Sequence, residues 1–161
     1  NHTQGWAVMA DCRLGNGNRA YRHYRAYMPS RFNDEPEVRG LEPYAHCQTT
    51  HSRFSERFGT GCVPWLSGTA SWSYYAATQH ILGIRPEEGG LRIDPCIPSE
   101  WKGFSVRRLF RGRQLNITVE NPEGVEKGVA EVVLNGESIE GNLISPDGLQ
   151  EENEVRVVMG S

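Results

Sequence analysis

The sequence predicts an α+β protein in which helices joined by long loops precede part of a β-sandwich. Two observations predict this order. Up to about residue 86, apolar residues recur with the spacing of one helix face, whereas from Leu91 onward they alternate with a period of two. Glycine accounts for 18 of the 161 residues, above the usual frequency of about 7%, which indicates many tight turns. We therefore expect a helical part over residues 1–85 and a β part over residues 86–161.

The first two helices are expected to form a hairpin. Apolar residues with helical spacing predict a helix over residues 2–14, which Gly15-Asn16-Gly17 ends. Asn18 is suited to cap a second helix, and Pro29 sets the C-terminal limit of that helix. The short break between the two helices favours an antiparallel αα-hairpin.

Residues 29–64 are predicted to be a long connection between helices. They contain four prolines and no sustained period, and connections of this length are usually functional or poorly ordered. A third helix is expected from residues 67–69 to Leu82, with Gly83 ending it. The small residues along this helix predict close packing against another helix.

The β part shows two hairpin signals. Asn135-Gly136 is the strongest two-residue turn signal in the chain, and Gly112-Arg113 is a second one. The strands are expected at Leu91–Ile93, Ser105–Phe110, Gln114–Val119, Val129–Leu134, Glu137–Ile139 and Val155–Met159.

Composition and charge argue against several classes of function. The formal net charge is −3, which disfavours a basic nucleic-acid surface, and no apolar run is long enough to span a membrane. The four cysteines form no Cys-x-x-Cys pair, so we expect reduced cysteines in the cytoplasm and no structural zinc. The spacing of His46, Cys47 and His51 matches no established metal site, and we expect no metal or organic cofactor.

The strongest local signal for chemistry is the start of the third helix. Ser67, Gly68 and Thr69 lie there between two tryptophans, where backbone N–H groups and hydroxyls suit a bound anion. The plainer interpretation is that Ser67 or Thr69 only caps the helix. His2 lies at another helix start and is able to donate a hydrogen bond to a phosphate or a sugar. Gln48, in the long connection, offers both donor and acceptor groups.

Several segments, taken together, resemble the C-terminal part of the glycoside hydrolase family 94 phosphorylases, which include cellobiose phosphorylase and its relatives. The resemblance covers essentially the whole chain, and the role of Glu42 stays open within it. The segments are Asn1–Ala7, Glu42–Tyr44, Cys47–His51, Pro64–Trp72, Ile81–Pro86 and Ile93–Pro98.

The resemblance implies a fold and a reaction. Residues 1–85 would be the end of an (α/α)6 catalytic barrel, and residues 86–161 a jelly-roll-like C-terminal β domain. The reaction would be inverting phosphorolysis, in which an Asp protonates the glycosidic oxygen while inorganic phosphate attacks the anomeric carbon from the opposite face. The products would be an α-sugar 1-phosphate and a shortened sugar, and inorganic phosphate would serve as co-substrate.

The resemblance also implies roles for individual residues. His2 and the pair Ser67-Gly68 would bind phosphate, although the family has Thr where this chain has Ser67. Gln48 and Thr69 would contact substrate or phosphate. No catalytic residue is expected in this chain, because the general acid Asp and further phosphate-binding residues would lie upstream of Asn1. The chain has no initiator methionine, so we expect the remainder of the enzyme upstream and an inactive isolated piece.

The expected substrate is cellobiose, which would yield α-glucose 1-phosphate and glucose. The alternatives are N,N′-diacetylchitobiose or another β-glucoside or cellodextrin. Alternatives of another class are a non-catalytic carbohydrate-binding piece and a structural β domain on an unrelated helical enzyme. The family resemblance further implies a homodimer, and the cysteine pattern favours a cytoplasmic location.

Overall fold

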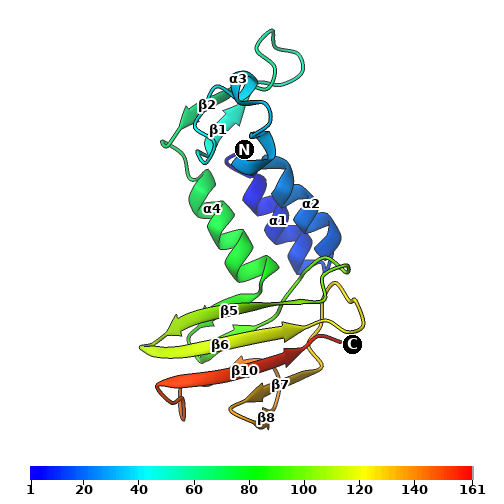
Figure 1. Ribbon diagram of the computed structural model, residues 1–161, viewed down its shortest axis with the longest axis vertical. Helices are drawn as coiled ribbons and strands as arrows, with labels where there is room; N and C mark the ends of the chain where they lie inside the picture. Colours follow the sequence, from blue (N-terminus) through cyan, green and yellow to red (C-terminus); the bar gives the residue numbers. More distant parts are fainter. Residues whose placement is uncertain (161) are drawn as a thin grey trace.

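The computed structural model describes residues 1–160 and has an α+β fold, as the sequence predicts. The helical part and the β part lie end to end, and the N-terminus lies at the far end of the helices (Figure 1). The helical elements are α1 (Gln4–Arg13), α2 (Gly17–Tyr27), η1 (Pro29–Phe32), α3 (Pro36–Arg39), α4 (Thr69–Tyr75) and η2 (Ala76–Ile81).

The predicted hairpin of α1 and α2 is confirmed, but the predicted cap of α2 is wrong. Asn16 is the N-cap residue, and its side chain makes no capping hydrogen bond. Asn18 lies inside the first turn and faces the β part instead. Its Nδ2 donates to Glu126 Oε1 at 2.9 Å, and its Oδ1 accepts from the backbone N–H of Ser99 at 3.1 Å. A partner that is distant in sequence therefore outcompetes the local capping bond.

The third predicted helix is present as α4, which continues as the π-helical segment η2. Gly83 ends it with a φ of +67°, as expected of a glycine at this position. Close packing between helices occurs where Gly5 of α1 meets Trp72 of α4. A Cβ at Gly5 would lie 3.0 Å from both the Cβ and the carbonyl oxygen of Trp72, so a larger residue would crowd the two helices at this point.

The long connection between α2 and α4 is ordered and carries regular structure. It contains η1, α3 and a two-stranded antiparallel sheet, formed by β1 (Cys47–Thr50) and β2 (Gly61–Pro64). This small sheet lies over the N-terminal ends of α1 and α4 (Figure 1). The sequence shows no period in this region because each of its elements is only four residues long.

The β part contains two sheets. The larger has the strand order β5-β6-β10-β7-β8, and the smaller has the order β3-β4-β9. Within the larger sheet β10 runs parallel to β6, whereas the other neighbours are antiparallel. The strands are β3 (Ile84–Glu87), β4 (Gly90–Ile93), β5 (Gly103–Phe110), β6 (Arg113–Glu120), β7 (Glu131–Leu134), β8 (Glu137–Ile139), β9 (Leu143–Ile144) and β10 (Glu152–Val158).

Both predicted hairpins are confirmed. Asn135 and Gly136 have φ values of +52° and +89° between β7 and β8, which is the mirror-image turn that matches strand twist. The turn between β5 and β6 lies at Arg111-Gly112, one residue before the predicted position, with φ values of +49° and +80°. The sequence did not reveal β3 or the two-residue strand β9.

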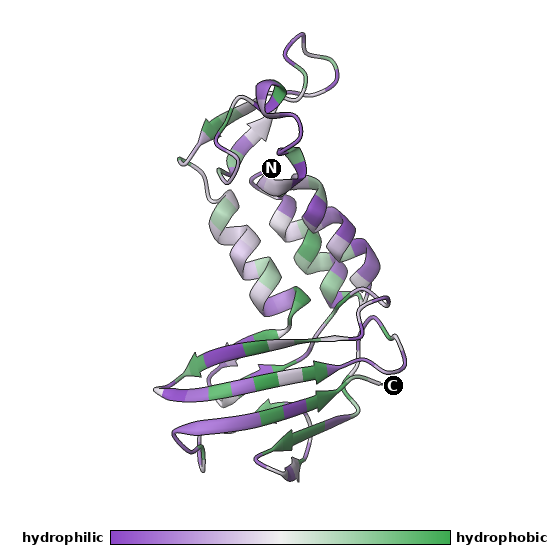
Figure 2. Ribbon diagram, viewed as in Figure 1, coloured by the Kyte–Doolittle hydropathy of each residue, from purple (hydrophilic) through white to green (hydrophobic). Residues whose placement is uncertain are grey.

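The core of the β part is shared between its two sheets. Leu91 of the smaller sheet, together with Leu115 and Val157 of the larger, is 0% exposed, and all three belong to one apolar cluster. Hydrophobic and hydrophilic residues alternate along β5, β6 and β10 (Figure 2). This alternation is the pattern expected of strands with one buried face.

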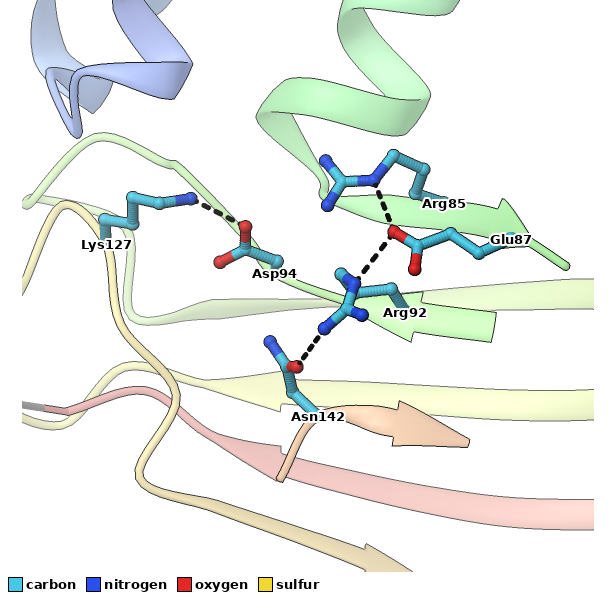
Figure 3. Close-up of polar contacts among 6 residues, drawn as sticks. All are labelled: Arg85, Glu87, Arg92, Asp94, Lys127 and Asn142. Atoms are coloured by element: carbon cyan, nitrogen blue, oxygen red, sulfur yellow. Dashed lines mark hydrogen bonds and ion pairs between the residues drawn. The ribbon is translucent and has the colours of Figure 1, made fainter. Parts of the chain in front are cut away.

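Ion pairs form a network on the smaller sheet, near the ends of the helices (Figure 3). Glu87 Oε1 accepts from Arg85 Nε at 3.1 Å and from Arg92 Nε at 2.8 Å. Lys127 Nζ lies 2.8 Å from Asp94 Oδ2. These pairs tie β3, β4 and the neighbouring loops of the β part to one another, below the helices. None of the helices within residues 1–160 has the length and apolar character needed to cross a membrane.

Candidate functional site

The site residues expected from the sequence come together at the N-terminal ends of α1 and α4. His2 lies two residues before α1, and Ser67 and Gly68 immediately precede α4. The two helix starts lie at the same end of the helical part, beneath the β1–β2 sheet (Figure 1). Segments that are more than 60 residues apart in sequence are therefore brought together.

The central contact is a hydrogen bond between His2 and Gly68. The backbone N–H of Gly68 donates to Nδ1 of His2 at 3.2 Å. Because Nδ1 accepts a hydrogen bond here, the neutral imidazole carries its proton on Nε2, which becomes a hydrogen-bond donor. Glycine is needed at residue 68, since a Cβ would lie 2.8 Å from Cε1 of His2. The site therefore presents an oriented N–H donor at a helix start.

Ser67 and Thr69 form a short chain of hydrogen bonds. The hydroxyl of Ser67 donates to Oγ1 of Thr69 at 2.7 Å, and its oxygen accepts the backbone N–H of Thr69 at 3.0 Å. The hydroxyl of Thr69 donates in turn to the carbonyl of Cys47 at 3.0 Å. Thr69 is only 1% exposed, so the structure places it behind Ser67, which it orients.

Gln48 borders the same site through β1. Its carbonyl accepts the backbone N–H of His2 at 2.9 Å, and the residue is exposed. Asn1 Nδ2 donates to Oγ1 of Thr50 at 2.8 Å, which adds a second contact between β1 and the residues before α1. Strand β1 thus fixes the position of His2, and the side chain of Gln48 is free to meet a ligand.

Aromatic side chains surround the two helix starts. Trp6 packs edge-on against Trp72 with ring centroids 5.6 Å apart, and Trp6 is itself 47% exposed. On the other side, Trp65 Nε1 donates to Glu42 Oε1 at 3.3 Å, and Trp65 adopts a φ of +66°. The contact with Trp65 gives Glu42 a partner within this chain. Exposed aromatic faces beside hydrogen-bond donors suit a sugar ring.

The region holds no metal cluster among the residues that the structure describes. His51 Nδ1 lies 3.1 Å from the hydroxyl of Ser55, and Cys47 Sγ accepts from Asn1 Nδ2 at 3.1 Å. Burial lowers the pKa of His46, and the nearby Arg39 guanidinium lowers it further. All four cysteines are free, and Cys12, Cys47 and Cys96 are buried.

The sequence reasoning missed one buried residue next to this site, Arg39. It is 2% exposed, and its Nη2 lies 4.0 Å from Cys47 Sγ. A lone arginine in a charged, Pro-containing segment carries no sequence signal that distinguishes it from its exposed neighbours.

Comparison with known proteins gives two adjoining matches along the chain. Residues 1–83 match the family model for the catalytic domain of the glycosyl hydrolase 94 superfamily. Residues 84–140 match the model for the C-terminal domain of glycosyl hydrolase family 65.

Several similar proteins carry the names of disaccharide phosphorylases. The chain is 44% identical to an N,N′-diacetylchitobiose phosphorylase of Vibrio proteolyticus and 42% identical to one of Vibrio furnissii, each over 99% of this chain. It is 33% identical, over 96% of its length, to a solabiose phosphorylase of Paenibacillus borealis. In each case the chain spans 20% of the relative's length.

Proposed function

The chain belongs to the glycosyl hydrolase 94 superfamily, and from this membership we propose that it is the C-terminal part of an inverting disaccharide phosphorylase. The proposed substrate of the complete enzyme is N,N′-diacetylchitobiose. Cellobiose, which the sequence alone favours, is replaced in this proposal because the relatives that are 44% and 42% identical are named diacetylchitobiose phosphorylases.

The observation that carries the proposal is the hydrogen bond between His2 and Gly68. It brings together the residues for which the family resemblance implies phosphate binding, and it aims an N–H donor from Nε2 of His2. The start of α1 adds the partial positive charge of a helix N-terminus. A phosphate beside His2 and Ser67 would receive hydrogen bonds from both, with the hydroxyl of Ser67 turning its proton from Thr69 to the ligand.

In the proposed reaction these residues hold the attacking phosphate. One phosphate oxygen attacks the anomeric carbon, the glycosidic bond breaks, and a general acid protonates the departing sugar oxygen. Because attack occurs opposite to the leaving group, the β-linkage yields an α-sugar 1-phosphate. We propose that the general acid and the remaining phosphate ligands belong to the rest of the enzyme, and that no carboxylate of this chain serves as the acid.

The reaction is tested with the complete protein. With diacetylchitobiose and inorganic phosphate, it should release α-N-acetylglucosamine 1-phosphate and N-acetylglucosamine, and without phosphate it should release neither. Cellobiose under the same conditions should be a much poorer substrate. Sugar release without phosphate would identify a hydrolase and reject the proposal, whereas faster phosphorolysis of cellobiose would reject only the proposed substrate.

The phosphate site is tested by Ser67→Ala in the complete protein. Loss of one hydrogen bond to an anion should raise the phosphate KM by roughly tenfold. Ser67→Thr is the matched control, because it keeps the hydroxyl and restores the residue found in the family, so its phosphate KM should stay close to that of the parent. An unchanged phosphate KM in Ser67→Ala would contradict the assignment of this site.

The wider arrangement is also a proposal. We propose that residues 1–85 complete an (α/α)6 barrel, that residues 86–161 form its jelly-roll-like β domain, and that the enzyme is a cytoplasmic homodimer. The family resemblance supports the barrel, the β domain and the homodimer, and the four free cysteines support the cytoplasmic location. Sedimentation of the complete protein at a monomer mass would reject the homodimer.

A further inference from the structure

Arg39 is a buried cation beside the start of β1, the strand that borders the proposed phosphate site. It is the last residue of α3, and only 2% of it is exposed. Its Nη2 donates to the carbonyl of Ala45 at 2.9 Å and lies 4.0 Å from Cys47 Sγ. Its Nε and Nη1 atoms are buried and have no hydrogen-bond partner. Solvent therefore reaches neither of these two nitrogen atoms.

No carboxylate compensates this charge. Within residues 1–160 none of the ion pairs includes Arg39. The guanidinium instead lies over the ring of Phe32, with Cζ 4.7 Å from the ring centroid, and such stacking offsets part of the cost of burial. A buried charge without a counterion is unfavourable for folding, so its presence calls for another explanation.

Arg39 is connected to the proposed phosphate ligands through the start of β1. It holds the carbonyl of Ala45, two residues before the Cys47 carbonyl that accepts from Thr69. Thr69 orients Ser67, and the carbonyl of Gln48, the next residue along β1, fixes the backbone of His2. Residues 45–48 thus contact both Thr69 and the backbone of His2. Arg39 holds the start of this segment through the carbonyl of Ala45.

We propose that Arg39 is a positioning residue for phosphate, which anchors residues 45–47 and supplies a fixed positive charge behind the site. This inference rests on the proposed phosphorylase function. In the protein interior a charge acts over several ångströms with little screening. Phosphate brings negative charge, so its arrival compensates the buried guanidinium, whereas a neutral disaccharide gains nothing from it.

The experiment compares Arg39→Gln and Arg39→Lys in the complete protein. Arg39→Gln keeps a donor for the carbonyl of Ala45 but removes the charge, and it should raise the phosphate KM on the order of tenfold, as expected for one lost charged interaction. The disaccharide KM should change much less. Arg39→Lys keeps the charge and should recover most of the phosphate affinity.

A second pair of variants changes the charge without removing the arginine. Cys47→Asp would place a carboxylate beside Arg39 and neutralise it, so the phosphate KM should rise. Cys47→Asn has nearly the same shape without the charge, and its phosphate KM should rise clearly less. This pair decides the question if Arg39→Gln does not fold.

The results that would overturn the inference are specific. It is wrong if Arg39→Gln leaves the phosphate KM unchanged, if glutamine and lysine affect the KM of both substrates equally, or if Cys47→Asp and Cys47→Asn behave alike. Ser67→Ala separates this failure from failure of the proposed function. If Ser67→Ala raises the phosphate KM and Arg39→Gln does not, only the role of Arg39 is rejected; if neither variant changes it, the site itself is rejected.

Discussion

The helical part and the β part differ in how completely each buries its own apolar side chains. Among residues 1–160, every large exposed hydrophobic side chain except Leu109 lies in the helical part, and Phe54, Trp65 and Leu66 are more than 60% exposed. The largest fully buried side chains show the opposite distribution, since all except Val8 lie in the β part. The β part therefore holds most of the buried core, which continues between the helices through residues such as Val8 and Ala20. The helical part also leaves apolar surface for further contacts.

This difference shows that the two parts obtain their stability from different sources. The two packed sheets gain most of their stability from apolar residues of their own strands. Helices with exposed aromatic side chains at one end depend on what they pack against, in keeping with the proposal that they complete a larger barrel. The proposed phosphate site lies at this open end, where side chains are available to a ligand.

The strongest test of this comparison is to separate the two parts. Residues 84–161, which include β3, should fold alone and unfold cooperatively, because most of the buried core lies among their own strands. Residues 1–83 alone should lack a cooperative transition. Thermal unfolding followed by circular dichroism and the dispersion of NMR spectra would measure both. Cooperative folding of residues 1–83 alone would contradict the claim that the helical part depends on further contacts.

Substitutions of a buried and an exposed leucine test which side chains form the core of the β part. Leu115 is 0% exposed, whereas Leu109, on the neighbouring strand, is 67% exposed. Leu115→Ala should lower the free energy of unfolding by about 2–5 kcal/mol, and Leu109→Ala should change it by less than about 0.5 kcal/mol. Urea denaturation of the folded β part, or of the whole chain, provides the measurement. Equal effects of the two substitutions would contradict the assigned core.

The junction between the two parts should respond to pH through His80. This residue lies in η2 and is 6% exposed. Burial, followed by the positive charges of Arg85, Arg13 and Lys127, lowers its pKa from 6.5 to about 4, and the opposing charge of Asp94 is a smaller influence. Between these values the unfolded chain binds a proton that the folded chain does not. Stability should therefore be complete above pH 6.5 and fall as the pH drops toward 4, by up to about 3 kcal/mol.

The contribution of His80 is measured as the difference between the parent and His80→Phe. Between pH 7 and pH 4 the urea midpoint of the variant should fall less steeply than that of the parent. Phenylalanine keeps the ring contact with Tyr75 but cannot titrate. Identical pH profiles would show that His80 does not couple protonation to folding.

Local sequence signals predicted those elements whose signal is itself local. The hairpin at Asn135-Gly136 was correct because these residues favour the φ values that the turn requires. The cap assigned to Asn18 was wrong because Glu126, which is more than 100 residues away, takes its hydrogen bonds. Likewise, no local pattern reveals the pairing of β10 with β6, which depends on the assembled sheet.

The candidate site was predictable in part. The types of residue at 67–69 indicated an anion site beside a helix start, and the family resemblance added His2. The contact between His2 and Gly68 is tertiary, so spacing alone does not imply it. Arg39 was missed because burial of a single arginine leaves no trace in composition or periodicity.

The order of strands in the large sheet has a consequence for how the β part assembles. Strand β10 lies between β6 and β7, although it follows both in sequence. The hairpins β5-β6 and β7-β8 can each form as soon as they are synthesised, but they remain separate, with open edges, until residues 152–158 arrive to join them. On the ribosome, the sheet therefore closes from its middle, as the last of its strands emerges.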